Sequence, residues 1–147
     1  MFAVLHDFVR CLIWLAFVAM NLAIAEIAHA AFNVSHVDTT EAVSQGKTQS
    51  ASVAIESNAE MNDVNVQVAV VDATRRVVAK QAFKDTRFRA GDVRTFKVNF
   101  PTTTFAAGTY TLSVTIFGPN WTPTFHFEDD LAKFDVFVPQ TKAGKTP

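Results

Sequence analysis

The sequence predicts an all-β fold, in which seven strands form two antiparallel sheets that pack face to face as a sandwich. Three observations support this fold class. Apolar and polar residues alternate with a period of two along most of the chain after residue 30. Clusters of Gly, Asn, Asp and Ser separate these runs at intervals of about ten residues. Each run has one apolar face, and two sheets are needed to bury those faces against each other.

Residues 1–30 have the pattern of a secretory signal peptide. A lead with one Arg is followed by the unbroken apolar run Cys11–Met20, and residues 28–30 form a small-x-small exit. A membrane anchor is the alternative, but Asn21 and Glu26 interrupt the apolar run, and a spanning helix needs about 20 mostly apolar residues. We therefore expect cleavage after residue 30 and a secreted or periplasmic protein.

The rest of the chain divides into one sandwich domain, residues 31–138, and a polar tail, residues 139–147, which we expect to be disordered. Beyond residue 30 the numbers of basic and acidic side chains are equal, so we expect no nucleic-acid partner and no membrane association after cleavage. The single cysteine, Cys11, lies in the signal segment, which leaves the domain without a disulfide, a thiol nucleophile or a thiolate ligand.

The strand from Tyr110 to Ile116 has the most regular alternation, with apolar side chains on one face and Thr and Ser on the other. The last strand, residues 132–138, alternates in the same way and places Phe134 in the predicted core. The other five expected strands lie near residues 32–37, 51–56, 64–70, 76–83 and 96–100.

Tyr110 is the only Tyr in the chain, and it opens the penultimate predicted strand directly after Gly108-Thr109. This position matches that of a tyrosine corner, in which the ring joins the core and the hydroxyl bonds to the backbone a few residues upstream. We therefore expect Tyr110 to have a structural role.

The segment 106–136 combines a G-x-Y strand ending in Ile-Phe, a loop with one Trp, an aromatic-x-aromatic step, an acidic pair and an A-x-F-x-V strand. It resembles the closing strands of immunoglobulin-like accessory modules at the C-terminal end of secreted bacterial glycoside hydrolases. In that family the aromatic step usually has Tyr and Trp followed by Asn, where this chain has Phe125, Phe127 and Glu128. The resemblance implies an immunoglobulin-like or fibronectin-like sandwich, extracytoplasmic placement and a link to polysaccharide, and it carries no activity.

The side chains beyond residue 30 do not supply a catalytic set. A Ser-His-Asp site needs a His held by a carboxylate beside a Ser, and only His36 and His126 are present. A glycosidase needs two carboxylates across a cleft, whereas Glu128, Asp129 and Asp130 are consecutive. There is no Gly-rich phosphate loop. We therefore predict that the protein is not an enzyme.

Copper-dependent polysaccharide oxygenases are an oxidative alternative, because they share a related sandwich and bind copper through an N-terminal His. Cleavage before His29 would create such an end. It would also place Glu26 at the −3 position, where signal cleavage needs a small neutral residue, so we expect no copper site.

The stretch HFEDD is a candidate calcium site, because His126, Glu128 and Asp130 alternate and would share one face of an extended segment. Calcium takes six or more oxygen ligands, and three side chains are too few without backbone carbonyls. A solvated acidic turn leading into the last strand is the alternative interpretation. We expect no cofactor, with calcium as the one metal left open.

Two interpretations of the aromatic loop remain. Trp121 lies between two prolines, and an exposed Trp there would form a platform for a sugar ring, with His126 and residues 128–130 as hydrogen-bonding partners. Alternatively, Trp121, Phe125 and Phe127 close the open end of the sandwich as a core cap. The sequence thus predicts a non-catalytic binding module for polysaccharide, or a protein-interaction or structural domain that pairs with an envelope or secreted protein.

Overall fold

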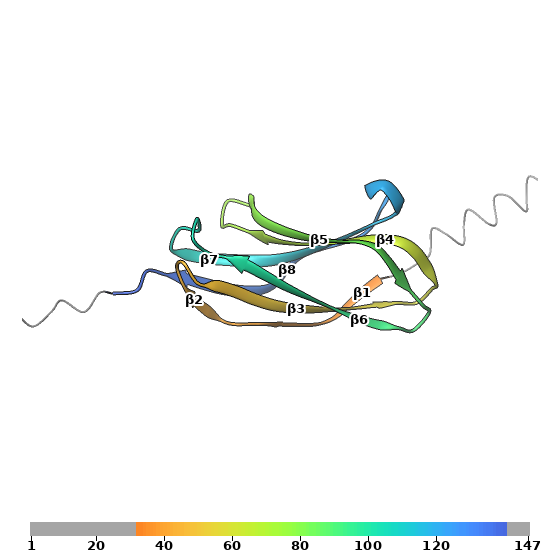
Figure 1. Cartoon of the computed structure of the whole chain (residues 1–147), viewed down its shortest axis with the longest axis horizontal. Coiled ribbons are helices and arrows are strands. Elements are labelled where there is room, and N and C mark those ends of the chain that lie inside the picture. The colour runs from red at the N-terminus through yellow and green to blue at the C-terminus, as the bar shows by residue number, and fades with distance from the viewer. Residues whose placement is uncertain (1–31, 141–147) are drawn as a thin grey trace, which may run out of the picture. The chain divides into compact units, whose positions relative to one another are not determined.

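The computed structural model describes residues 32–140, which fold into two sheets stacked face to face (Figure 1). The predicted signal peptide and its cleavage site, and residues 141–147 of the predicted tail, lie outside the described residues. Within residues 32–140, no helix is long and apolar enough to cross a membrane.

The described chain contains eight strands and one 3-10 helix. They are β1 (Phe32–Thr39), β2 (Ala42–Ser44), β3 (Thr48–Ser57), β4 (Met61–Val71), β5 (Val77–Phe88), β6 (Val93–Pro101), β7 (Gly108–Phe117), η1 (Pro119–Trp121) and β8 (Thr124–Phe137). The small sheet has the order β1-β3-β6, and the large sheet has the order β2-β8-β7-β4-β5. The all-β sandwich was predicted correctly, but the number of strands was one too low.

The strand that the sequence did not reveal is β2, which has three residues and pairs in parallel with the end of β8. Three residues are too few to display alternation, and only Val43 is buried. Backbone bonds extend this pairing on both sides, from Asp135 to Glu41 and from Gln45 to Phe137. The sandwich is therefore antiparallel except along this one edge.

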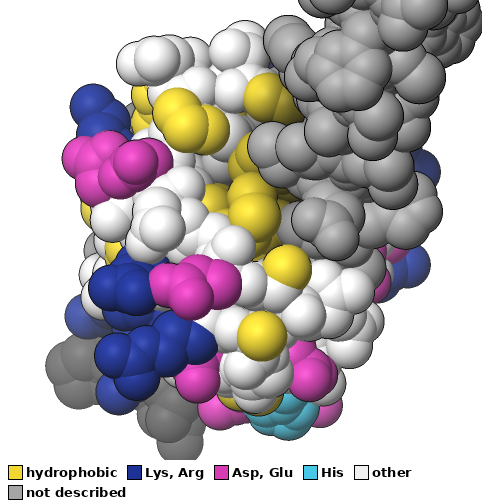
Figure 2. Space-filling model, turned by 90° about the vertical axis from the view of Figure 1, so that its right-hand side faces the viewer, with side chains coloured by type: hydrophobic (Ala, Val, Ile, Leu, Met, Phe, Trp, Pro, Cys, Tyr) yellow, Lys and Arg dark blue, Asp and Glu magenta, His cyan; other side chains and the backbone are white. Residues whose placement is uncertain are grey.

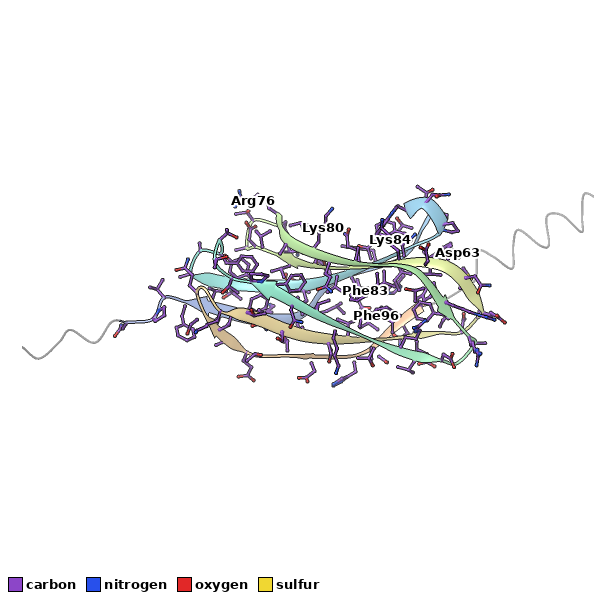
Figure 3. The ribbon with its side chains drawn as sticks, viewed as in Figure 1. Asp63, Arg76, Lys80, Phe83, Lys84 and Phe96 are labelled. Carbon is purple, nitrogen blue, oxygen red and sulfur yellow. The ribbon has the colours of Figure 1, made fainter. Side chains whose placement is uncertain are left out.

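The core lies between the inner faces of the two sheets, meaning the faces that point toward each other. Val64, Val66, Val68 and Val70 of β4 are fully buried, as are Leu112, Val114 and Ile116 of β7. Aromatic contacts bridge the sheets: the ring centroids of Phe32 and Phe88 lie 5.2 Å apart and those of Phe83 and Phe96 5.0 Å apart. Figure 3 shows Phe83 and Phe96 between the sheets, where they close the side formed by β5 and β6.

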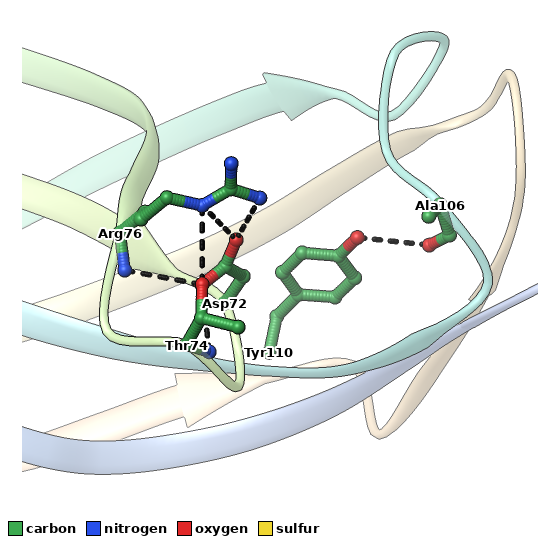
Figure 4. Close-up of polar contacts among 5 residues, drawn as sticks. All are labelled: Asp72, Thr74, Arg76, Ala106 and Tyr110. Atoms are coloured by element: carbon green, nitrogen blue, oxygen red, sulfur yellow. Dashed lines mark hydrogen bonds and ion pairs between the residues drawn. The ribbon is translucent and has the colours of Figure 1, made fainter.

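Tyr110 has the geometry expected of a tyrosine corner. Its hydroxyl donates a hydrogen bond to the backbone carbonyl of Ala106 at 2.9 Å (Figure 4). Its ring stacks near Phe134 at 5.7 Å and near Phe105 at 5.0 Å, and all three side chains are buried. The loop before β7 is thus fixed to the core by one ring and one hydroxyl.

The last strand begins at Thr124, well before the predicted residue 132, because two bulges interrupt its pairing with β7. Ile116 pairs with His126 and Phe117 pairs with Thr124, which leaves Phe125 as an extra residue. Farther along, Leu112 pairs with Ala132 and Val114 with Glu128, which leaves residues 129–131 opposite Ser113. The acidic residues therefore form a bulge inside β8, and the prediction of a turn before the strand was wrong.

Tyr110→Phe tests the corner. The substitution keeps the ring but removes the hydroxyl and leaves the Ala106 carbonyl without this partner, so the free energy of unfolding should fall by about 1 kcal/mol. Urea unfolding measures the loss. As a control, Thr109→Val removes an exposed side-chain bond to Asp135 and should change stability by less. Equal stability of Tyr110→Phe and the wild type would contradict a structural role for the hydroxyl.

Candidate functional site

The structure does not bring the predicted site residues together in one place. Trp121 lies in η1, at the end of the sandwich between β7 and β8. His126 and Glu128 pair with the core residues Ile116 and Val114 and thus face the inner side of β8. Asp129 and Asp130 lie in the bulge. Neither the single aromatic-acidic site nor the predicted common face of His126, Glu128 and Asp130 is formed as one cluster.

Trp121 is partly exposed, so it is neither a fully buried cap nor a free platform. Its ring meets that of Phe117 edge to face, with the centroids 5.4 Å apart. Phe117 is also only partly buried. The two rings therefore form an aromatic contact at the surface of the large sheet.

Asn65 fixes the loop that carries Trp121. It is buried on β4, its amide nitrogen donates to the carbonyl of Gly118 at 2.9 Å, and its amide oxygen accepts from the backbone of Asp85 at 3.4 Å. Gly118 must lack a side chain, because a Cβ there would come within 2.7 Å of the Thr122 carbonyl and 2.9 Å of the Phe125 ring. One amide thus ties the η1 loop to two strands.

Phe127 was predicted to join the core, and the structure shows that this was wrong, because its side chain is 60% exposed. It pairs with Thr115 on the outer face of the large sheet, the face that points away from the small sheet. Phe125, in contrast, is the extra residue of the first bulge and stacks against Phe32 of β1 at 6.2 Å. The single-residue bulge therefore places the two rings on opposite sides of β8.

Phe117 and Phe127 share the outer face, and Trp121 packs against Phe117; we call these three side chains the aromatic patch. Phe117 lies two residues beyond Thr115, the partner of Phe127, so the two positions are diagonal neighbours across β7 and β8. Contiguous exposed apolar patches often mark binding surfaces, so the aromatic patch is a candidate for one.

A row of outer-face residues, which we call the polar floor, runs from the aromatic patch across the sheet. Register places Phe127, Thr115, Gln67 and Ala82 side by side on β8, β7, β4 and β5, in one row on the outer face. At about 4.8 Å between strands, the row is about 14 Å long. A shallow hollow of about 380 Å³ lies at its β5 end, lined by Gln67, Val77, Val78, Ala79 and Lys80. Sequence analysis missed these floor residues, because Thr and Gln on an outer face also fit ordinary solvated strands.

His126 and Glu128 form a pair of their own. The His126 Nε2 and Glu128 Oε2 atoms lie 3.2 Å apart, which is possible because residues two apart on a strand share a side. Both side chains are partly exposed. The pair lies on the side of β8 opposite Phe127 and does not contribute to the aromatic patch.

Asp129 and Asp130 share one cation from a different part of the chain. Arg75, in the turn between β4 and β5, bonds to the Asp129 carboxylate and places its Nη2 atom 3.3 Å from Asp130. The backbone of both Arg75 and Asp130 has positive φ, at 65° and 54°, as is common in tight turns and bulges. The acidic pair is therefore engaged by one cation, which offsets one of its two negative charges.

Asp72 organises the turn that presents Arg75. Its carboxylate accepts bonds from the Thr74 hydroxyl at 2.6 Å, the Thr74 amide at 2.8 Å and the Arg76 guanidinium at 2.8 and 3.0 Å (Figure 4). The Thr74 hydroxyl, followed by the Arg76 backbone amide, lowers the pKa of Asp72 far below its ordinary value. The turn is thus built around one ionised carboxylate.

Across residues 32–140, no group of three or more His, Cys, Asp or Glu side chains lies close enough together to hold one metal ion. The acidic and histidine side chains of HFEDD do not converge on one point, because they have different partners. Arg75 engages Asp129 and Asp130, while His126 and Glu128 bond to each other.

The small sheet has a larger hollow on its own outer face, with a volume of about 560 Å³. Its lining is polar or small: Asp38, Thr39, Thr40, Ser50, Ala51, Ser52, Lys97, Val98 and Asn99. Ser50 bonds to Asn99 across it at 2.7 Å. No aromatic side chain lines this hollow, so it offers no ring on which a ligand could stack.

No family model matches the chain, and a search of curated proteins finds no match. Among solved structures, the chain is similar to the C-terminal domain of wzt, with a TM-score of 0.64, 14% identity and 79% of each chain covered. A CARDB domain from Pyrococcus furiosus, solved in complex with di-metal ions, matches with a TM-score of 0.50 and 15% identity over 75% of this chain and 89% of that one. A β-glucosidase from Erythrobacter marinus matches with a TM-score of 0.50 and 10% identity over 74% of this chain and 16% of the enzyme.

These likenesses establish an immunoglobulin-like β-sandwich fold, and at such low identity they establish the fold alone. The chain spans about a sixth of the length of the β-glucosidase that it matches. The predicted resemblance to accessory modules of glycoside hydrolases is thus supported at the level of the fold and only in part.

Asn65→Ala tests the anchoring of the η1 loop. It leaves the Gly118 carbonyl without its buried donor, so the free energy of unfolding should fall by about 1–3 kcal/mol. In a Trp14→Phe background, where Trp121 is the only Trp, its fluorescence should also shift to the red as the loop loosens. Gln67→Ala, the next outer-face amide on β4, is the control and should stay within about 0.5 kcal/mol of wild type. Equal effects of the two substitutions would contradict the anchoring role.

Asp72→Asn tests the β4–β5 turn. Because the pKa of Asp72 is depressed in the folded state, its carboxylate stabilises the fold above the unfolded value of about 3.9, and this stabilisation is lost progressively as the pH falls toward the depressed value. The variant should be less stable than wild type at pH 7, and the difference should shrink as the pH is lowered from about 4 to about 2. Urea unfolding across this pH range measures both, and a difference independent of pH would contradict the turn's dependence on charge.

Proposed function

We propose that this domain is a non-catalytic binding module that holds a polysaccharide on the outer face of its large sheet. The observation that carries the proposal is the aromatic patch, with Phe127 60% exposed beside the Phe117–Trp121 contact. Flat aromatic rings offer sugar rings an apolar surface, and burial of that surface favours binding.

The floor beside the patch supplies the polar groups that a glycan needs. Thr115 and Gln67 continue the row from Phe127, and Thr111 lies farther along β7 on the same face. Their hydroxyl and amide groups can both donate and accept hydrogen bonds. The aromatic patch can therefore contact the apolar face of a sugar ring, and the polar floor can bond to its hydroxyl groups.

The absence of catalysis is part of the proposal. In the described part of the chain, the hydrogen-bond partner of the His126 ring is Glu128, and no Ser completes a nucleophilic triad around it. Asp129 and Asp130 are adjacent and share the cation Arg75, so they cannot act as two separate carboxylates across a substrate.

Location outside the cytoplasm is likewise proposed, on the signal pattern of residues 1–30. A polysaccharide-binding module in that compartment would serve an enzyme or an assembly that processes the polymer. The immunoglobulin-like fold is compatible with this role, as it is with many others.

A protein-interaction domain is the second candidate, favoured by the outer edge of β5, which among residues 32–140 pairs with β4 alone. An extended partner strand could pair there. However, β5 carries Lys80 and Lys84 and is bulged near Asp85, features that discourage pairing at an edge. The aromatic patch therefore has the stronger claim.

Phe127→Ala tests the function. It removes the most exposed ring of the patch, so the Kd for a bound polysaccharide should rise at least about tenfold, as when an interface anchor is truncated. Because the side chain is exposed, stability should change by less than about 0.5 kcal/mol. Affinity electrophoresis against a panel of soluble polysaccharides, with pull-down on insoluble ones, measures binding.

Phe137→Ala is the matched control, because Phe137 lies at the far end of the same strand and is 47% exposed. It should leave binding unchanged. If Phe127→Ala and Phe137→Ala bind equally well, the aromatic patch is not the binding site. If wild type binds none of the polysaccharides and instead pairs through β5 with a protein, the second candidate function is correct.

A further inference from the structure

The basic side chains are concentrated on one part of the domain. Eight of the chain's 13 Lys and Arg residues lie between Arg75 and Lys97, together with only two of its 14 Asp and Glu residues. This segment forms β5, β6 and the turns beside them. Figure 2, which views the right-hand end of Figure 1, shows Lys and Arg side chains at its lower left beside acidic groups. A balanced net charge therefore hides a strong local asymmetry.

Three of these cations are already engaged with carboxylates. Arg75 bonds to the acidic bulge, Arg76 to Asp72 and Arg87 to Glu60. Lys80 and Lys84 differ from them, because both are exposed and neither has an ion pair or hydrogen bond with any side chain of residues 32–140. They are two positive charges on one strand that form no ion pair within residues 32–140.

These two lysines lie on the same outer face as the aromatic patch. Lys80 pairs with Ala69, whose neighbours Val68 and Val70 are in the core, so Lys80 faces outward. Figure 3 shows Lys80 and Lys84 in a row along β5, on the side that points away from the small sheet. They flank Ala82, the last residue of the row that begins with Phe127.

From this geometry we propose that the ligand is an anionic polysaccharide, which stacks on the aromatic patch and crosses the sheet to Lys80 and Lys84. The inference rests on the proposed polysaccharide function and adds the chemical class of the polymer. The row of about 14 Å is long enough for a few sugar units. Carboxylate or sulfate groups at its β5 end would meet two cations that have no side-chain partner within the described part of the chain.

The acidic residues on the same face are partly offset by a cation and lie away from the two lysines. Asp129 and Asp130 would repel an anion, but Arg75 offsets one of their two charges, and they lie on β8, across β7 and β4 from the lysines of β5. The small number of cations on this face also favours a polysaccharide over a nucleic acid. Nucleic-acid binding usually rests on several phosphate contacts, and Lys80 and Lys84 provide only two.

The experiment uses one polymer in two charge states: polygalacturonate and its fully methyl-esterified form, which keeps the sugar backbone and loses the carboxylates. Binding of the full chain is measured by affinity electrophoresis or calorimetry at about 0.05 M salt and again at about 0.5 M, where screening is strong. We expect wild type to bind polygalacturonate about tenfold more tightly than the ester at low salt, with most of this preference lost at high salt.

The test variant is Lys80→Gln/Lys84→Gln, and the matched control is Lys47→Gln/Lys97→Gln, which removes the same charge at positions outside the strands of the large sheet, Lys97 on β6 of the small sheet and Lys47 in the loop before β3. The test variant should bind both polymers within about twofold of each other, while the control keeps the preference. Both lysines are exposed, so the test variant should fold with wild-type stability. Dextran sulfate compared with dextran provides a second arm, which shows whether sulfate replaces carboxylate.

Each other outcome overturns the inference in an identifiable way. Equal binding of the acid and ester forms by wild type overturns the anionic class and leaves the polysaccharide function standing. Equal loss of the preference in both double variants overturns the assignment to Lys80 and Lys84. Binding of single-stranded DNA as tightly as polygalacturonate, lost in the test variant, replaces the polysaccharide with a nucleic acid. Binding of no polysaccharide in any arm overturns both proposals.

Discussion

The uninterrupted pairing of β4 with β7 is the constraint on which the rest of the sandwich depends. From Asn65–Phe117 to Val71–Thr111 the register runs without a bulge, and the side chains of both strands with no exposed surface fall on one side. These two strands lie in the middle of the large sheet, so their alternation decides which side of every neighbouring residue is core and which is surface. The bulged strands β5 and β8 flank this regular centre and can deviate only because it is fixed.

The sequence predicted those elements whose physics is local. Alternation in β4 and β7 follows directly from burial on one side, and Tyr110 follows from a recognised corner geometry, so both were found. The parallel strand β2 was not predicted, because its three residues form a strand only by pairing with β8 and show no pattern of their own. The bulges were missed for the same reason, because the register of β8 depends on its partner strand β7. That register places the acidic residues inside the strand, where the sequence predicted a turn.

The candidate site was predicted less well than the fold, because it depends more on contacts between distant residues. The sequence left Trp121 open as a sugar platform or as part of a core cap. The cap interpretation placed Phe127 in the core, and the platform interpretation grouped the acidic residues with the ligand. Both errors arise from nonlocal contacts: the extra residue Phe125 separates the two Phe side chains, and Arg75, more than fifty residues away in sequence, engages Asp129 and Asp130. The lysines of β5 could not be linked to the aromatic patch until the register across four strands was known.

The two bulges in β8 differ in a way that bears on how this strand can change in length. The first adds the single residue Phe125 and inverts the sides of the chain before it. The second lets residues 128 and 132 of β8 face Val114 and Leu112, so it adds an even number of residues and leaves the inward and outward sides in phase. At the second bulge, deletions or insertions of two residues would therefore keep Phe134 and Val136 in the core. A change of one residue would exchange the inward and outward sides of that half of the strand. Related sequences that differ in length at the second bulge should therefore differ by an even number of residues.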